Sequence, residues 1–149
     1  MIVAAGSAYG EYLEQSAYVC QPGRFFRQIE HMGFYTGKEL KSEIALILHR
    51  RDQVPWTREH AEKLRTRKEP FDEAIAALIG RQWDSQSIWR GRRREGDAYM
   101  VFCLTGPNDP ETLVMRQAVA HDGRSGWTQN QRYVSFDVLS RSPRTTDEL

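Results

Sequence analysis

Short apolar runs separated by turn residues recur along the chain, and most of them predict β-strands. Residues 17–20 form one such run, which stops at the turn signal in residues 21–23. Residues 31–36 read as a second strand, and residues 36–38 follow as a tight turn in which a glycine can take positive φ. Residues 44–48 are continuously apolar, and this fits a strand that is buried on both faces.

A helical period appears in the middle of the chain. Thr57 is a natural N-cap, and Ala61 and Leu64 lie on one face of the helix that follows it. Pro70 ends this helix and suits the first turn of a second one. An apolar stripe with helical spacing predicts the second helix, and it comprises Phe71, Ala74, Ile75, Leu78 and Ile79.

The last third of the chain returns to strands. Residues 81–97 are polar and predict a long loop, whereas residues 98–105 form the clearest strand pattern of the sequence. Shorter strands are expected at residues 112–115 and 132–136. Because strands bracket one helical pair, we predict a single α+β domain over residues 1–149, with a curled, mostly antiparallel sheet or a small β-barrel into which the helical pair is inserted.

Composition and cysteine usage narrow the class of protein. Charged residues make up 28% of the 149 residues, the mean hydropathy is −0.65, and no stretch of about 18 apolar residues occurs. A membrane span is therefore not expected. Cys20 and Cys103 each lie in an apolar run, which predicts buried, reduced thiols and a cytoplasmic location. A disulfide between them stays open at this point.

The net charge is only +1, but arginines gather in two short segments, residues 50–51 and 92–94. The planar guanidinium group suits phosphates and base edges, and it stacks on aromatic rings. These segments are therefore candidates for binding nucleic acid. The alternative is a solvated face of mixed charge, because Glu59, Glu62 and Glu69 lie among the basic residues.

The tryptophans have an unusual setting, because all four lie in or next to polar segments: Trp56, Trp83, Trp89 and Trp127. Aromatic residues usually belong to the core, but aromatics interleaved with arginine are typical of proteins that bind single strands or flipped bases. The loop at residues 121–127 adds a cation, Arg124, to the stacking plane of Trp127. It is either a ligand loop or a simple hairpin connection.

Patterns for catalysis and metal binding are weak. Glu39 and Lys41 have the Glu-x-Lys spacing of a large nuclease class, in which a second, upstream carboxylate helps to hold magnesium. Only Glu11, Glu14 and Glu30 precede this pair. The histidines and cysteines lack the paired spacing of a zinc site, and buried thiols are poor nucleophiles. The sequence therefore predicts no catalytic residue, no metal ligand and no cofactor.

Two segments resemble a known family. "HMGFYTGKELKSEIALIL", residues 31–48, resembles the strand–turn–strand element of PUA-like barrel modules, the group that includes EVE and ASCH domains. "QRYVSFDVLSRSPRTTDEL", residues 131–149, resembles the closing strand and short helix after such barrels in restriction-associated and nuclease-associated proteins. The resemblance implies a small curled barrel that binds RNA or holds a modified DNA base in an aromatic-lined pocket. Phe34 and Tyr35 stand where the family's strand motif places its aromatic pair.

We therefore predict a nucleic-acid-binding module with DNA or RNA as its partner, and a modified-base reader of a prokaryotic restriction or defence system as its specific form. The alternatives are a non-catalytic protein-interaction domain and, with less support, a metal-dependent nuclease. The residues predicted to bind nucleic acid are Tyr35, Arg50, Arg51, Trp56, Trp89, Arg92, Arg93, Arg94, Arg124 and Trp127.

Overall fold

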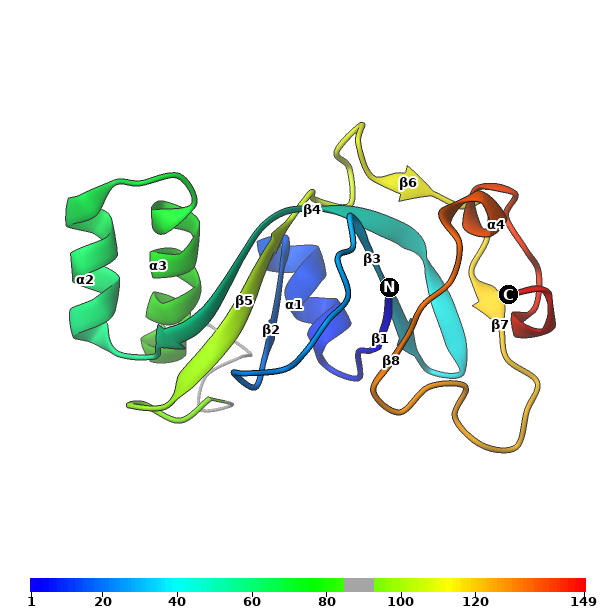
Figure 1. Ribbon diagram of the computed structural model, residues 1–149, viewed down its shortest axis with the longest axis horizontal. Helices are drawn as coiled ribbons and strands as arrows, with labels where there is room; N and C mark the ends of the chain where they lie inside the picture. Colours follow the sequence, from blue (N-terminus) through cyan, green and yellow to red (C-terminus); the bar gives the residue numbers. More distant parts are fainter. Residues whose placement is uncertain (85–92) are drawn as a thin grey trace. The chain divides into compact units, whose positions relative to one another are not determined.

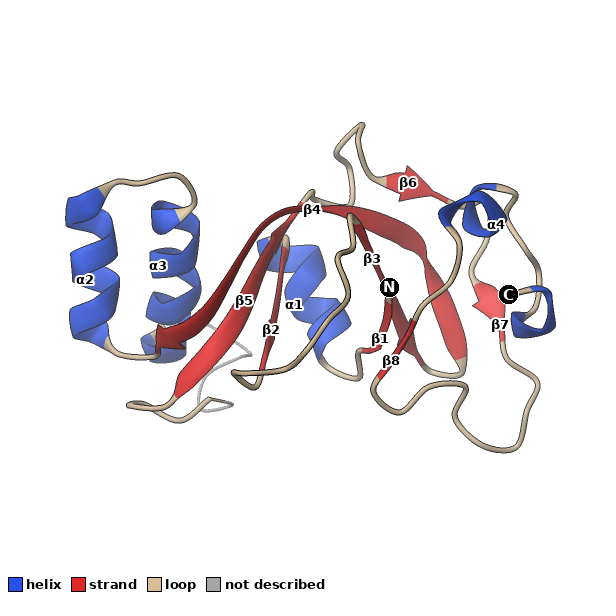
Figure 2. Cartoon of the chain, in the orientation of Figure 1, coloured by secondary structure: helices blue, strands red, loops and turns tan. Residues whose placement is uncertain are grey.

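The computed structural model describes residues 1–84 and 93–149 and shows an α+β fold (Figures 1 and 2). Its described strands form an eight-stranded, mixed, mostly antiparallel open sheet, accompanied by a pair of helices. In chain order the elements are β1 (Ile2–Ala4), α1 (Ala8–Gln15), β2 (Ala17–Cys20), β3 (His31–Thr36), β4 (Glu39–Pro55), α2 (Arg58–Arg67), α3 (Asp72–Gly80), η1 (Arg81–Trp83), β5 (Ala98–Leu104), β6 (Leu113–Val114), β7 (Val119–Ala120), β8 (Gln131–Arg132), α4 (Phe136–Ser140) and η2 (Thr146–Glu148).

The chain divides into two compact units, and the long strand β4 contributes residues to both. Unit 1 comprises residues 1–16, 26–47 and 104–149, and unit 2 comprises residues 17–25 and 48–103. Each unit has its own cluster of buried hydrophobic side chains.

In unit 1, β3 pairs antiparallel with the first half of β4 and parallel with β1, and β8 lies antiparallel to β1. The β3–β4 turn places Gly37 at φ 63° and Lys38 at φ 62°, as a two-residue type I′ hairpin requires. The buried cluster of this unit comprises Ile2, Tyr35, Leu40, Ile44, Met115, Val119, Trp127 and Leu139.

In unit 2, β5 lies between β2 and β4, and α2 packs against α3. The Thr57 hydroxyl accepts a hydrogen bond from the backbone N–H of His60 at 3.1 Å, and this confirms the predicted N-cap of α2. Apolar residues of both helices share a core with the strands, and they include Ala61, Leu64, Ile75, Leu78 and Ile79. The predicted helical pair is therefore present.

Several expectations hold and others need correction. The predicted strands at residues 17–20 and 31–36 are β2 and β3. The apolar run at residues 44–48 is only part of β4, because the mostly polar segment that follows continues the same strand to Pro55. The predicted strand at residues 132–136 is shorter, because Phe136 already begins α4. The described strands stay open, so the predicted closure into a small β-barrel is wrong.

Both cysteines are buried and unpaired, as the sequence predicted. They lie on the neighbouring strands β2 and β5, where Cys20 is opposite Met100 and Cys103 is opposite Ala17. Burial raises the pKa of the Cys103 thiol to about 11, so this side chain stays protonated at neutral pH. Within residues 1–84 and 93–149, no helix combines the length and the apolar character needed to cross a membrane.

Gly33 on β3 gives a direct test of the packing in unit 1. A Cβ atom at this position would lie 2.7 Å from the Cδ1 atoms of both Ile2 and Ile44, whose side chains are fully buried. We expect Gly33→Ala to lower the free energy of unfolding by about 1–3 kcal/mol, because an overpacked core cannot relax without strain. Urea denaturation measures this. Gly126→Ala is the control, since its nearest neighbour would be 3.8 Å away. Equal stability of the two variants would contradict the close packing of Gly33 against Ile2 and Ile44.

Candidate nucleic-acid interface

The second half of β4 presents two different faces. Leu48, Arg50 and Asp52 point to the exposed side, whereas His49 and Arg51 are half-buried on the other. The His49 ring stacks on Phe71 just before α3, with ring centroids 4.8 Å apart and an interplanar angle of 4°. One face of the strand thus contacts the helical pair, and the other carries the exposed side chain of Arg50.

The chain after β2 lies along the exposed side of β4. The backbone N–H of Gly23 donates to both carboxylate oxygens of Asp52, at 3.1 and 3.2 Å. Arg50 donates from Nη2 to the carbonyl oxygen of Arg24 at 3.4 Å, and its guanidinium carbon lies 5.6 Å from the centre of the Phe102 ring. These contacts hold the Arg50 side chain over the sheet instead of leaving it to rotate freely in water.

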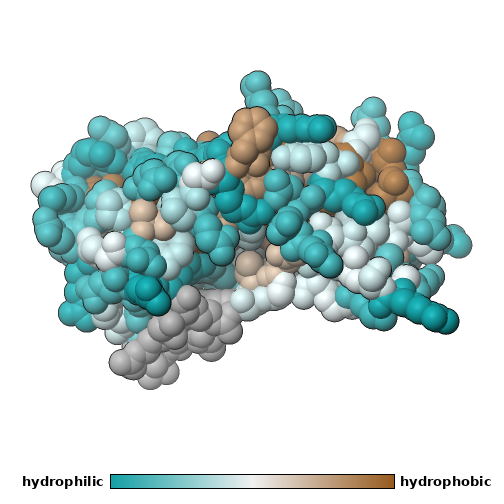
Figure 3. Space-filling model, turned by 60° about the horizontal axis from the view of Figure 1, so that its bottom comes forward, coloured by the Kyte–Doolittle hydropathy of each residue, from teal (hydrophilic) through white to brown (hydrophobic). Residues whose placement is uncertain are grey.

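Phe25 follows directly and is 84% exposed, which is unusual for a large hydrophobic side chain. Leu48 is 43% exposed on β4, on the same side of the strand as Arg50. We call the group of Arg24, Phe25, Leu48 and Arg50 the Phe25 surface; all four belong to unit 2. Figure 3 shows that the hydrophobic side chains on one face of the molecule are scattered among hydrophilic ones. Sequence reasoning missed Phe25, although its place directly after a turn and outside any apolar period was a signal.

Charge is distributed unevenly between the units. Unit 2 has 13 Lys and Arg against 9 Asp and Glu (13 − 9 = +4), whereas unit 1 has 8 against 11 (8 − 11 = −3). The net charge of +1 therefore conceals a basic unit and an acidic one. A polyanion would be attracted to unit 2, which carries the Phe25 surface.

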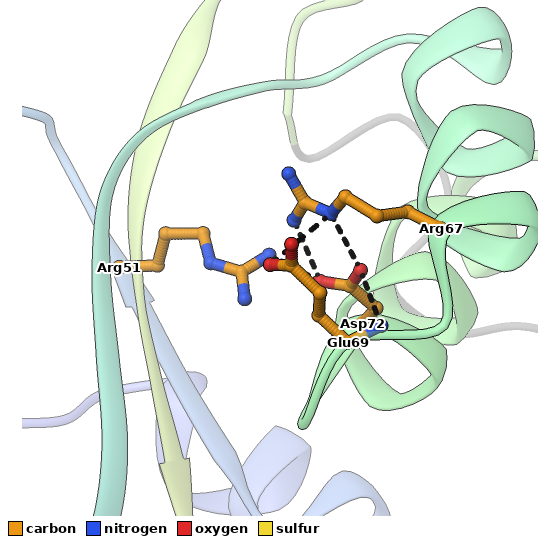
Figure 4. Close-up of polar contacts among 4 residues, drawn as sticks. All are labelled: Arg51, Arg67, Glu69 and Asp72. Carbon is orange, nitrogen blue, oxygen red and sulfur yellow. Dashed lines mark hydrogen bonds and ion pairs between the residues drawn. The ribbon is translucent and has the colours of Figure 1, made fainter.

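Arg51, predicted to bind nucleic acid, instead binds a buried carboxylate (Figure 4). The Asp72 side chain has 0% exposure and accepts hydrogen bonds from Arg51 at 2.7 Å and from Arg67 at 2.8 Å through two nitrogens. The backbone N–H of Glu69 adds a further bond at 3.1 Å. Arg67 first, and then Arg51, hold the pKa of Asp72 far below its usual range. Arg51 therefore fixes the start of α3 against β4.

The predicted binding aromatic of unit 2 that the structure describes, Trp56, is buried. Trp56 is only 1% exposed, with the Arg93 guanidinium 5.1 Å from its ring centre and the Tyr99 ring edge-on at 5.3 Å. Its indole joins the core because burying so large an apolar surface outweighs the polar character of its sequence neighbours. The Arg94 backbone N–H donates to the Tyr99 hydroxyl at 3.0 Å. The predicted residues Trp89 and Arg92 lie outside the described residues.

In unit 1 the structure brings Tyr35 and Trp127 together. Their ring centroids are 5.8 Å apart, and the backbone N–H of Trp127 donates to the Tyr35 hydroxyl at 3.2 Å. Both side chains are buried, and the Arg132 guanidinium lies 4.5 Å from the Trp127 ring centre. The loop at residues 121–127 is closed on itself, because the His121 ring bonds to the carbonyl oxygen of Ser125 at 2.9 Å. Arg124 is exposed on this loop.

The residues of the nuclease alternative form only a local contact. Lys41 donates to the Glu39 carboxylate, and the two side chains make an ion pair on neighbouring outward positions of β4. Across the described part of the chain, no three His, Cys, Asp or Glu side chains are arranged to hold a metal ion.

Comparisons with protein-family models, curated proteins and solved structures found no match for this chain. The resemblance to PUA-like modules therefore stays a prediction from sequence. Of the predicted binding residues that the structure describes, only Arg50, Arg94 and Arg124 are exposed.

The Asp72 contacts generate a prediction about stability. We expect Asp72→Asn to lower the thermal midpoint by more than about 5 °C, because it leaves two arginines without their shared carboxylate in a partly buried position. Since the pKa of Asp72 is lowered on folding, its contribution is complete above the unfolded value of about 4 and is lost as the pH falls.

Thermal unfolding of both proteins between about pH 7 and pH 2 provides the measurement. The gap between wild type and Asp72→Asn should narrow as the pH falls below about 4. Glu73→Gln is the matched control, because Glu73 is the exposed neighbour on the same turn of α3. A gap of the same size at every pH would show that the carboxylate charge is not what stabilises this contact.

Proposed function

We propose that unit 2 binds nucleic acid through the Phe25 surface. The observation that carries this proposal is an aromatic ring, 84% exposed, that directly follows Arg24, whose carbonyl oxygen accepts a hydrogen bond from the exposed Arg50. A guanidinium group suits a phosphate, and an exposed ring offers a flat apolar face to a base. The surplus of positive charge in unit 2 supports the same conclusion.

The anchoring of Arg50 favours binding. Its contacts with the Arg24 carbonyl and the Phe102 ring already restrict its side chain, so less conformational freedom is lost when a phosphate arrives. Phe25 has the complementary role, because stacking on a protein ring stabilises a bound base by about 1–3 kcal/mol. Bases inside a duplex are already stacked on one another, so this surface is suited to an unpaired base.

Protein interaction is a second candidate, and the exposure of Phe25 and Leu48 favours it. Apolar side chains beside arginine also occur at the centre of protein interfaces. The two functions differ in their response to salt, because phosphate contacts release counterions and an apolar interface does not. Screening plain and base-modified oligonucleotides, DNA and RNA, also tests the modified-base preference that the sequence resemblance predicts.

The test combines variants that separate the ring from the charge. We expect Phe25→Ala to weaken binding of a single-stranded oligonucleotide by about 1–3 kcal/mol with an unchanged salt dependence. Phe25→Leu should weaken it similarly, because leucine keeps the apolar surface but loses the stacking face. Arg50→Ala should reduce the slope of log K against log salt by about 0.7, the value of one phosphate contact. Fluorescence anisotropy measures all three.

Arg116→Ala, which removes an exposed arginine from unit 1, is the control for net charge. It should leave affinity and slope nearly unchanged. No binding of wild type to any oligonucleotide at about 50 mM salt, where phosphate contacts are strong, would exclude the proposal. If Phe25→Leu binds the oligonucleotide as tightly as wild type while Phe25→Ala binds it weakly, Phe25 contacts the strand through its apolar surface and not by stacking on a base.

A further inference from the structure

A second cationic site lies between the helices of unit 2. One face of α2 carries Arg58, Ala61, Glu62 and Arg65, and this face meets Gly80 at the end of α3 and Trp83 in η1. These six residues line a groove of about 210 Å³. We call it the α2–η1 groove.

Trp83 and Arg58 form one side of the groove. The Arg58 guanidinium carbon lies 4.9 Å from the centre of the Trp83 ring, a distance typical of a cation–π contact. Trp83 packs against the core of unit 2 and is only partly buried, whereas Arg58 is exposed. The contact places a charged group and an aromatic surface side by side at a site that solvent can reach.

Arg65 and Gly80 form the other side. A Cβ atom at position 80 would lie 3.3 Å from Nη2 of Arg65. The absence of a side chain at Gly80 therefore leaves space for the Arg65 guanidinium at the end of α3. Arg65 also makes an ion pair with Glu62, three residues earlier on the same helix. That pair is exposed, so an incoming anion can displace the Glu62 carboxylate at low cost.

The charges select the kind of ligand. Arg58 and Arg65 are cationic and Glu62 is anionic, which leaves the groove with one unbalanced positive charge. A single phosphodiester carries one negative charge, matches this balance, and suits the donor fork of arginine. The adjoining sugar or base would then lie against the indole of Trp83.

We infer that the α2–η1 groove is a second contact site for a nucleic-acid strand, in which Arg58 and Arg65 bind one phosphodiester and Trp83 contacts the neighbouring nucleoside. The inference rests on the proposed function, because the strand is the ligand proposed for the Phe25 surface of the same unit. Glu62 competes with the phosphodiester for Arg65. An acidic peptide, whose carboxylates resemble the phosphodiester in charge, is the competing ligand that the experiment distinguishes.

The experiment uses the full chain and a thymidine oligonucleotide of about 12 nucleotides. Glu62→Gln should tighten binding about two- to five-fold, because Arg65 is freed from an exposed ion pair. A merely structural role of Glu62 would not increase affinity. The double variant Arg58→Ala/Arg65→Ala should weaken binding and lower the salt slope by about 0.7. Lys63→Ala is the control, because Lys63 is exposed on α2, pairs with Glu59 at 2.8 Å, and does not line the groove.

Tryptophan fluorescence reports on the site directly. The oligonucleotide should quench wild type more than Trp83→Phe, and a poly-glutamate peptide at equal charge should not. Quenching by the peptide alone would overturn the inference in favour of a protein partner.

The outcomes separate the two proposals. If the double arginine variant and Lys63→Ala bind alike while Arg50→Ala binds weakly, the groove is not a contact site and the Phe25 surface is. If Arg50→Ala binds normally while the groove variants bind weakly, the strand is held by the groove, and the proposal for the Phe25 surface is wrong.

Discussion

Strand β4 determines the arrangement of unit 2, because between Leu48 and Asp52 its side chains alternate between a helix-facing and an open side. On one side, Arg51 and His49 contact the start of α3, and the Asp72 carboxylate ties that strand to Arg67 of α2. On the other side, Arg50 and Asp52 hold the chain that follows β2. Arg51 thus stabilises the packing of α3 against β4, whereas its neighbour Arg50 is exposed at the surface.

Arginine–aromatic contacts recur in the described residues and explain how tryptophans that lie in polar segments of the sequence are packed. In unit 2 they join Arg93 to Trp56 and Arg58 to Trp83, and in unit 1 they join Arg132 to Trp127. A guanidinium group stacked on an aromatic ring gains a cation–π interaction, and the N–H groups at its edge remain available for hydrogen bonds. Arginine-rich segments can therefore fold compactly and still offer donors to a ligand.

The sequence was informative where local patterns dominate. The N-cap at Thr57 and the strand at residues 31–36 depend on nearest neighbours and were predicted correctly. The apolar stripe of α3 was predicted in part, because Ala74 is exposed and Ala76 is buried instead. β1 and β7 were missed, because three- and two-residue strands are specified by their partners and not by their own pattern. The burial of Trp56 and the pairing of Arg51 with Asp72 depend on contacts between distant segments. Phe25 was overlooked for a related reason, since exposure is a property of the whole unit.

The Asp72 contacts also bear on how unit 2 opens. One carboxylate receives bonds from β4, from α2 and from the backbone just before α3, so no one of these segments can separate without breaking bonds to another. Local unfolding in proteins follows such shared contacts and proceeds in cooperative blocks. The two helices and the second half of β4 should therefore behave as one block in amide hydrogen exchange.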